Sequence, residues 1–366
     1  MNEQLLSKRR LLMVIAAIAV TLLGTVGCTA QKQPDPAPGA ETRVQIFYYP
    51  WYGTPDREPG WIHWTQNGHT PPGDIGAHYY PQLGPYSSSD PHVLDQHMIW
   101  LKQARVGVLV TSWWGPGSRE DAMTPAVLDA AAEHGLKVAF HLETYRGRTA
   151  ESVKRDIQYI YGHYGGHPAF FRTARPTHWG PSPAPRGVFY VFESLHVPDA
   201  DWKGMLDSLR NTSDDAIVLG QTSDVTRLDT CHFDGLYTYD ALGYDGSTFP
   251  KLQAAITAKN AIFAPSIGPG YIDIRAVAGS TRNKPRADGA TYDRMWQSVA
   301  EAAAEWVSIT SFNEWHEGSQ IEPAVPRAEA GFTYLNYDGA YGKRGAEASL
   351  AYIDRTAYWV AKFLGR

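Results

Sequence analysis

Eight short apolar runs, separated by segments with helical patterns, constrain the fold of this chain more than any other feature. The runs are rich in β-branched and aromatic residues, and most are apolar at consecutive positions, as strands buried on both faces are. They cover residues 44–49, 106–113, 136–142, 187–192, 216–221, 233–239, 261–266 and 306–312. Strands of this kind are typical of parallel sheets, in which a crossover joins each strand to the next.

The segments between the runs carry helix signals. Asp90 before Pro91 predicts a helix start, as do Thr124 before Pro125 and Thr149 before an apolar pattern at helical spacing. Further helices are expected over 202–209, 252–259, 292–305 and 346–364, and only a weak one over 223–230. This alternation predicts an α/β fold, a (β/α)8 TIM-type barrel. A doubly wound open sheet is the alternative, but no G-x-G-x-x-G follows the first run.

The barrel is expected to form one domain, residues 43–366, because no second linker or repeat interrupts it. Hydrophobic residues make up 43% of the chain, which excludes extensive disorder. Only two cysteines, Cys28 and Cys231, are present, which excludes a disulfide scaffold. A net charge of −5 argues against a nucleic-acid partner.

A basic and then apolar segment precedes this domain. Lys8, Arg9 and Arg10 are followed by an apolar run over 11–24, too short to span a bilayer comfortably, which predicts a signal peptide over 1–27. Cys28 and a Pro-rich tether, 28–42, follow at once, and this order resembles a bacterial lipoprotein signal in which the cysteine is acylated. An ordinary secretory signal is the alternative. Either predicts export, and the first predicts attachment to a membrane through the N-terminal lipid.

The connection after the first run is unusually long, residues 50–105. Its part over 51–89 shows no helical pattern and is rich in Trp, Tyr, His, Gly and Pro. Long irregular segments in compact domains are usually functional. Because this one leaves the C-terminal end of a strand, we expect it to lie over the active-site face of the barrel.

Carboxylates, imidazoles and aromatic rings gather at the ends of the predicted strands and in this loop. Aromatic faces beside hydrogen-bonding carboxylates suit sugars, whose C–H faces stack while their hydroxyls need polar partners. Each single Trp could equally be a core residue, and Glu143 could instead pair with Arg146 or Arg148. The candidate substrate-binding residues are Tyr48, Trp51, His63, Trp64, Trp113, Trp114, His141, Glu143, Tyr239, Asn313 and His316.

The densest cluster is SFNEWHEG at 311–318. Glu314 and Glu317 could supply the paired carboxylates of a glycosidase, one as acid and one as base. Two solvated acids in a surface loop are the alternative. A zinc-peptidase site is not expected, because His316 and Glu317 begin an H-E-x-x-H pattern whose fifth position is Gln320. No G-x-S-x-G elbow is present either.

Six motifs resemble glycoside hydrolase family 99. They are FYYPWYGTP at 47–55, YPQLGPYSS at 80–88, SWWGPG at 112–117, FHLE at 140–143, GPGYID at 268–273 and SFNEWHEG at 311–318. They run in order through most of the domain. The resemblance implies a (β/α)8 barrel and a retaining enzyme that cuts α-1,2-mannosidic linkages inside a chain, in α-mannan or mannose-rich glycans, without a cofactor.

The resemblance also implies roles for individual residues. Glu314 would act as general base on the mannose 2-hydroxyl, which attacks C1 to give a 1,2-anhydro sugar, and direct nucleophilic attack by Glu314 is the alternative. Glu317 would act as general acid and then activate water. Tyr48, Tyr239, His141 and Glu143 would line the cleaved mannose. Trp114, a Trp in bacterial members and a Tyr in vertebrate Golgi ones, would favour mannose over glucose in the neighbouring subsite.

Three other functions stay open at the level of sequence. The chain could be a non-catalytic surface lipoprotein that binds mannan, although both acids are retained. It could be a different barrel glycosidase, for example one acting on β-linked glucans. Metal-dependent hydrolysis is the third, and chelator sensitivity would reveal it.

Overall fold

The computed structural model describes residues 39–180, 184–329 and 331–365, all within one compact unit, Pro36–Arg366. The predicted signal peptide and Cys28 lie outside these described residues. Within them, no helix combines the length and the apolar character needed to cross a bilayer.

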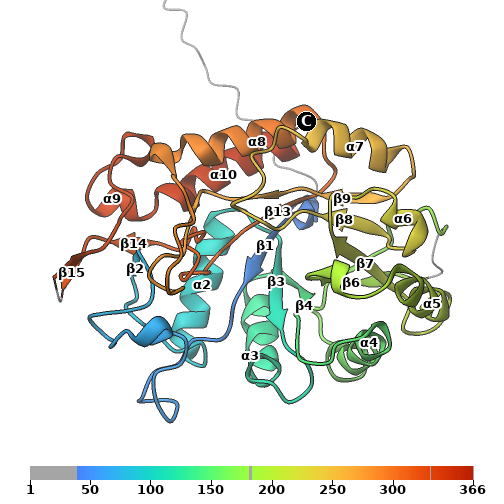
Figure 1. Cartoon of the computed structure of the whole chain (residues 1–366), viewed down its shortest axis with the longest axis horizontal. Coiled ribbons are helices and arrows are strands. Elements are labelled where there is room, and N and C mark those ends of the chain that lie inside the picture. The colour runs from blue at the N-terminus through green and yellow to red at the C-terminus, as the bar shows by residue number, and fades with distance from the viewer. Residues whose placement is uncertain (1–38, 181–183, 330, 366) are drawn as a thin grey trace, which may run out of the picture. The chain divides into compact units, whose positions relative to one another are not determined.

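Parallel strands form a nearly closed barrel with helices around it (Figure 1). In sheet order the strands are β10 (Ser266–Ile267), β13 (Val307–Ile309), β1 (Val44–Tyr48), β3 (Val108–Trp113), β4 (Lys137–Leu142), β6 (Arg186–Val191), β7 (Ala216–Gln221), β8 (Gly235–Tyr237) and β9 (Ile262–Ala264). Only Pro265 separates β9 from β10. Because β9 pairs with β8 and β10 pairs with β13, this broken strand joins the two ends of the sheet.

This arrangement confirms the predicted (β/α)8 barrel. Each of the eight apolar runs contains a barrel strand, and the run over 261–266 contains the break between β9 and β10. The open doubly wound alternative is excluded, because its sheet would have two unpaired edges.

The helices lie between consecutive strands or after the last one. They are α2 (Pro91–Gln103), α3 (Arg119–Glu133), α4 (Ala150–Tyr164), α5 (Asp199–Leu209), α6 (Arg227–Thr230), α7 (Phe249–Thr257), α8 (Ala290–Ala302), α9 (Ala346–Ser349) and α10 (Ala351–Leu364). Asp90 accepts a hydrogen bond from the backbone N–H of His92 at the start of α2, and Thr149 and Ser152 form a capping box at the start of α4. Both starts agree with the prediction.

The predicted helix start at Thr124 is wrong. Helix α3 begins five residues earlier, where Ser118 Oγ accepts from the backbone N–H of Asp121 at 3.0 Å. Pro125 therefore lies inside the helix and cannot donate to the carbonyl of Asp121. The hydroxyl of Tyr164 donates to the Asp121 carboxylate at 2.7 Å and lies 3.3 Å from that carbonyl, so it takes the place of the missing N–H beside the proline. The segment over 346–364 likewise divides at Leu350 into α9 and α10.

Side chains of β1 alternate between the inside and the outside of the barrel. Phe47 and Tyr49 belong to the inner cluster of buried residues, whereas Ile46 and Tyr48 pack against the surrounding helices. The long connection after β1 contains only a 3₁₀ turn, Gln66–Gly68, and the two-residue strand β2 (Tyr80–Pro81), which pairs with β14 (Ala324–Val325). The prediction that it lacks an α-helix before α2 is confirmed.

Five further short strands form two hairpins and one additional pairing with a barrel strand. β11 (Tyr271–Ile272) pairs with β12 (Asn283–Lys284), and β15 (Ala328–Glu329) pairs with β16 (Phe332–Thr333). β5 (Arg172–Thr173) pairs with the start of β6. The β11–β12 hairpin follows β10, and its residue Ile272 is hydrogen-bonded to Glu317 in the segment after β13.

Candidate active site

Glu314 is held rigidly in the turn after β13. Its backbone N–H donates to Ser311 Oγ at 2.8 Å, and its carboxylate Oε1 accepts from the backbone N–H of His316 at 3.1 Å. Only 3% of the residue is exposed. The carboxylate therefore has a fixed position, as a catalytic group requires.

Glu317 is anchored through its backbone. Its carbonyl accepts from the backbone N–H of Ile272 at 2.7 Å. The next residue, Gly318, has φ +58°, and a Cβ there would lie 2.6 Å from Cγ2 of Ile272, so only glycine fits. The guanidinium of Arg286 donates to the carbonyls of Gly318 at 2.9 Å and Gln320 at 2.7 Å. These contacts fix the backbone from which the Glu317 side chain extends.

The electrostatic surroundings of the two acids differ. Burial raises the pKa of Glu314, and the charge of Glu143 raises it further, whereas backbone N–H donors from His316 and Glu317 oppose the rise. Burial also raises the pKa of Glu317, and three acids, Glu314, Asp240 and Asp273, add to it. The pKa of each acid is raised to about 8, so the pair retains a proton near neutral pH. Backbone N–H groups stabilise the charge of Glu314, whereas three carboxylates surround Glu317.

A cavity of about 280 Å³ opens beside both acids. The Trp51 ring forms one wall and stacks on the His63 ring at 4.5 Å, and His316 Nε2 lies 3.0 Å from the carbonyl oxygen of His63. The lining residues are Trp51, His63, Gln66, Tyr271, Asp273, Ala276, Val277, Arg282, Glu314, His316 and Glu317. Five of the predicted site residues therefore line the same cavity. They are Trp51, His63, Glu314, His316 and Glu317.

The two imidazoles in this wall are uncharged at neutral pH. Burial lowers the pKa of His316 to about 4. Burial and the neighbouring His316 and Arg119 lower the pKa of His63 to about 3. Neither ring therefore adds a positive charge that would oppose protonation of the acids.

A second cavity, of about 260 Å³, borders Glu317 as well. It is lined by Phe192, Glu193, Gln221, Tyr239, Asp240, Ala241, Leu242, Tyr271, Arg282 and Glu317. Tyr239 and Glu193 have positive φ angles of 53° and 44°, an unusual conformation for residues other than glycine. Such conformations concentrate at functional sites. Tyr271, Arg282 and Glu317 are common to both cavities.

Tyr239 connects this wall to the ends of β1 and β4. Its hydroxyl is hydrogen-bonded to that of Tyr49, and its ring stacks on His141 at 5.3 Å. His141 Nδ1 lies 2.9 Å from Oε1 of Glu143, which also accepts from Ser112 Oγ at 2.8 Å. Arg148 contacts Glu143 through its carbonyl rather than its carboxylate. His141 and Glu143 are thus brought close to the acids, although both are almost fully buried.

Seven of the predicted side chains line neither cavity, and three of these seven pack elsewhere in the protein. Tyr48 points out of the barrel because it alternates with Tyr49, and its hydroxyl lies 3.0 Å from Nδ1 of His97. Trp113 alternates with Trp114 in the same way and donates to Asp121 at 3.0 Å. The indole N–H of Trp64 donates to the carbonyl of Tyr86 at 2.8 Å beneath the long loop. All three are fully buried packing residues.

Asn313 fixes the backbone next to the site. Its Oδ1 accepts from the backbone N–H of Tyr49 at 2.8 Å, and its Nδ2 donates to the carbonyl of the same residue at 3.0 Å. Asn313 is completely buried, so it positions the end of β1 rather than contacting a ligand. Trp114 is half-buried, and its indole nitrogen has no hydrogen-bond partner among the described residues.

Tyr271, Asp273 and Arg282 line the first cavity but were not among the predicted site residues. Tyr271 and Asp273 belong to the GPGYID motif, which follows the seventh strand, and reading that strand end as the others were read would have identified them. Arg282 lies nine residues after Asp273 and comes close to both residues because the β11–β12 hairpin folds back. No pattern in the sequence indicates that proximity.

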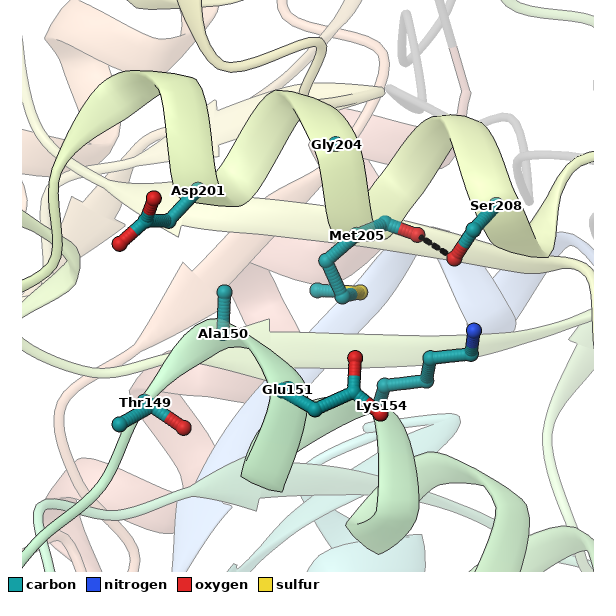
Figure 2. Close-up of a pocket in the computed structure, with 8 residues that line it drawn as sticks. All are labelled: Thr149, Ala150, Glu151, Lys154, Asp201, Gly204, Met205 and Ser208. Atoms are coloured by element: carbon teal, nitrogen blue, oxygen red, sulfur yellow. Dashed lines mark hydrogen bonds between the residues drawn. The ribbon is translucent and has the colours of Figure 1, made fainter.

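Two other observations concern ligand binding elsewhere. The described residues contain no group of three or more His, Cys, Asp or Glu side chains arranged to hold a metal ion. A separate groove of about 350 Å³ lies between α4 and α5, where Glu151 and Lys154 face Asp201 and Met205 (Figure 2). None of the candidate residues lines this groove.

Known proteins share both the sequence and the fold. The profile of glycosyl hydrolase family 99 matches residues 40–365. The chain is 37% identical over 372 residues to the human glycoprotein endo-alpha-1,2-mannosidase-like protein, covering 90% of this chain and 78% of that protein. It is 36% identical over 357 residues to mouse glycoprotein endo-alpha-1,2-mannosidase, with 87% and 74% covered.

A solved structure agrees with this relationship. The GH99 endo-alpha-mannosidase of Bacteroides thetaiotaomicron is 36% identical and superposes with a TM-score of 0.78 over 88% of this chain and 97% of that one. The profile match spans the whole barrel and the pair Glu314 and Glu317. The chain therefore belongs to glycosyl hydrolase family 99 and is a glycoside hydrolase.

Proposed function

We propose that this glycoside hydrolase cleaves internal α-1,2-mannosidic linkages of α-mannan or mannose-rich glycans with retention of configuration. The observation that carries the proposal is the buried pair Glu314 and Glu317, which line one cavity and whose raised pKa values keep a proton on the pair near neutral pH. The substrate class is supported by relatives that are named endo-alpha-1,2-mannosidases.

In the first step Glu314, whose carboxylate accepts a hydrogen bond from the backbone N–H of His316, acts as the base. It takes the proton of the mannose 2-hydroxyl while the 2-oxygen forms a bond to C1. Glu317 gives its proton to the departing oxygen, which takes the electron pair of the broken C1–O bond. In α-mannose the axial 2-oxygen lies trans to the axial leaving group, as backside displacement requires. The product is a 1,2-anhydro sugar.

In the second step the roles reverse. Glu317, now a carboxylate, takes a proton from water as the water oxygen forms a bond to C1. The bond between C1 and the 2-oxygen breaks, and Glu314 returns a proton to the 2-oxygen, which takes the electron pair. Two inversions give overall retention. This route needs no covalent bond between C1 and a carboxylate, in contrast to ordinary double displacement.

Cleavage inside a chain is supported by the two cavities. Both border Glu317, so a glycan longer than the cleaved residue has space in the second cavity as well as the first. Aromatic side chains face both cavities, with Trp51 in one and Tyr239 in the other. Stacked rings of this kind suit the C–H faces of successive sugars.

The decisive experiment uses two tetrasaccharides that share an internal α-1,2-linked mannose, one ending in α-1,3-mannose and one in α-1,3-glucose. Products are followed by NMR. We expect release of a disaccharide with α configuration, faster from the mannose-ended substrate, and loss of cleavage in Glu317→Gln. Glu133→Gln, an exposed position at the end of α3, is the matched control. No cleavage by folded protein would overturn the proposal and leave glycan binding as the function.

A 2-deoxy version of the cleaved mannose separates the two roles considered for Glu314. If Glu314 activates the 2-hydroxyl, the 2-deoxy substrate is not cleaved. If Glu314 attacks C1 directly, cleavage of that substrate persists and a covalent glycosyl enzyme is detectable by mass spectrometry.

The N-terminal sequence supports a proposal about location. The basic and apolar pattern over 8–27, followed by Cys28, favours export and acylation of the mature N-terminus. Metabolic labelling with a fatty acid tests it, because Cys28→Ser would abolish incorporation from a lipoprotein but leave a plainly secreted protein unchanged.

A further inference from the structure

The hydroxyl of Tyr271 lies between two carboxylates. It is 3.0 Å from Oδ2 of Asp273 and 3.4 Å from Oε1 of Glu317. Tyr271 is 5% exposed and Asp273 is 1% exposed. A phenol has one proton to donate, so it serves one carboxylate at a time while its oxygen remains able to accept from the other.

The backbone holds the ring and the acid in one unit. Tyr271 pairs with Lys284 in the β11–β12 hairpin, and the backbone N–H of Ile272 donates to the carbonyl of Glu317 at 2.7 Å. Asp273 has its own partners, the guanidinium of Arg282 and the hydroxyl of Ser280. The Tyr271 O–H can therefore rotate between its two acceptors without movement of any heavy atom.

We infer that Tyr271 is a positioning residue whose hydroxyl alternates between Asp273 and Glu317 as Glu317 loses and regains its proton. The inference rests on the acid and base roles proposed above for Glu317. While Glu317 is protonated, it donates to the Tyr271 oxygen and the Tyr271 O–H donates to Asp273. Once Glu317 has given its proton to the departing oxygen, the Tyr271 O–H turns and donates to the new carboxylate.

The second step restores the starting arrangement. Glu317 takes a proton from the attacking water, and the Tyr271 O–H turns back to Asp273. The O–H bond of Tyr271 does not break in either step, so every proton that moves is transferred between substrate, water and the two glutamates. Tyr271 supplies a hydrogen bond to Glu317 only in the state in which Glu317 is charged.

Such a donor is needed because the surroundings of Glu317 are acidic. The groups that interact with it are the carboxylates of Glu314, Asp240 and Asp273, the hydroxyls of Tyr49, Tyr239 and Tyr271, and the guanidinium of Arg282. The three carboxylates raise the pKa of Glu317, and the hydrogen bond from Tyr271 lowers it. Tyr271 and Asp273 thus act on the same acid in opposite directions.

Opposite effects give a sharp test. Tyr271→Phe removes the donor, so the alkaline limb of the kcat/KM profile shifts to higher pH. Asp273→Asn removes a neighbouring charge and keeps a carbonyl acceptor, so the limb shifts to lower pH. Tyr159→Phe is the matched control, because its hydroxyl donates to Asp121 at 2.9 Å outside the site, and the profile is expected to stay unchanged.

The leaving group provides a second readout. Loss of a hydrogen bond to a charged group corresponds to a decrease in kcat of about ten- to a hundredfold for a sugar leaving group. A glycosyl fluoride needs little protonation on departure, so Tyr271→Phe is expected to cleave it nearly as fast as the wild type does, with KM unchanged for both substrates. Equal slowing of both substrates would indicate a purely structural role and overturn the inference.

A titration without turnover separates this inference from the proposed function. The ¹³C shift of the Glu317 carboxyl, assigned with Glu317→Gln, reports its pKa in the absence of substrate. We expect a higher pKa in Tyr271→Phe and a lower one in Asp273→Asn. If the two variants show these shifts but the wild-type protein cleaves no mannoside, only the proposed function is overturned. Wild-type protein that cleaves mannosides while both variants leave the pKa unchanged overturns the inference.

Discussion

Replacing Asn313 by alanine should destabilise the protein more than any exposed substitution and reduce its activity. The side chain makes two hydrogen bonds to the backbone of Tyr49, at 2.8 and 3.0 Å, and Nδ2 also donates to the hydroxyl of Tyr86 at 3.2 Å. Asn313 is 0% exposed and Tyr49 is 2% exposed, so water cannot replace the amide.

The magnitude follows from the groups left without partners. Asn313→Ala leaves the N–H and the C=O of Tyr49 unsatisfied, and each buried unsatisfied group costs about 1–3 kcal/mol. The expected loss is therefore about 2–6 kcal/mol, a large part of the roughly 5–15 kcal/mol that stabilises a typical domain. Asn313 also directly precedes Glu314, so a displaced backbone at this point moves the proposed base and should lower kcat/KM.

Urea unfolding at constant pH measures the loss of stability, and oligosaccharide cleavage measures the loss of activity. Asn336→Ala is the matched control, because Asn336 accepts a local hydrogen bond from the backbone N–H of Asp338 at 2.8 Å and its side chain has no other hydrogen-bond partner in the described part of the chain. Its removal should cost less than about 1 kcal/mol. A similarly small loss for Asn313→Ala would refute the reasoning, since it would mean that the backbone of Tyr49 finds other partners.

Three further predictions concern the acids and their turn. The pH profile of kcat/KM should be bell-shaped, with its alkaline limb well above the usual pKa of a glutamate, because burial and neighbouring charges keep one proton on the pair Glu314 and Glu317. An alkaline limb near the ordinary pKa of a glutamate would contradict this. Between the ordinary and the raised pKa, the folded state holds protons that the unfolded state releases, so the wild type loses stability as pH rises. Glu317→Gln lacks this loss, and thermal unfolding should therefore show it gaining stability over the wild type from about pH 5 to about pH 8. Gly318→Ala should reduce both stability and kcat more than Gly84→Ala, because both glycines have positive φ angles but only a Cβ at Gly318 would contact Ile272. Equal effects of the two substitutions in urea unfolding and cleavage assays would show that this close contact is unimportant.

The strands and the long loop could be predicted because their signals are local. Strands buried on both faces read as apolar runs, and the segment over 51–89 lacks helical periodicity whatever surrounds it. Residues at helix starts were predictable where the capping side chain lies next to the apolar pattern, as with Asp90. The start of α3 was not predictable, because Pro125 lies inside this helix and the residue next to it, Tyr164, comes from another helix.

The site was predicted less completely than the fold. Motif recognition identified the aromatic pairs Tyr48–Tyr49 and Trp113–Trp114, but strand alternation decides which member of each pair points inward, and the predicted set included an outward-facing member of each. Tyr271 enters the site on a hairpin outside the barrel strands. Its distance to Glu317 depends on how that hairpin folds back, which the strand pattern does not specify.

The base and the tip of the β11–β12 hairpin differ in how strongly they are tied to the active site. Its base is tied to Glu317 through the backbone of Ile272, whereas Ile274 and Val277 in the tip are 41% and 39% exposed and Val277 borders the first cavity. The residues between Asp273 and Ser280 can therefore be replaced by a segment of another composition, which changes the rim that an approaching glycan meets. Asp273 and its partners Ser280 and Arg282 then keep the geometry around Tyr271 and Glu317. Diversification of glycan choice in this scaffold can thus proceed by loop replacement, independently of the chemistry.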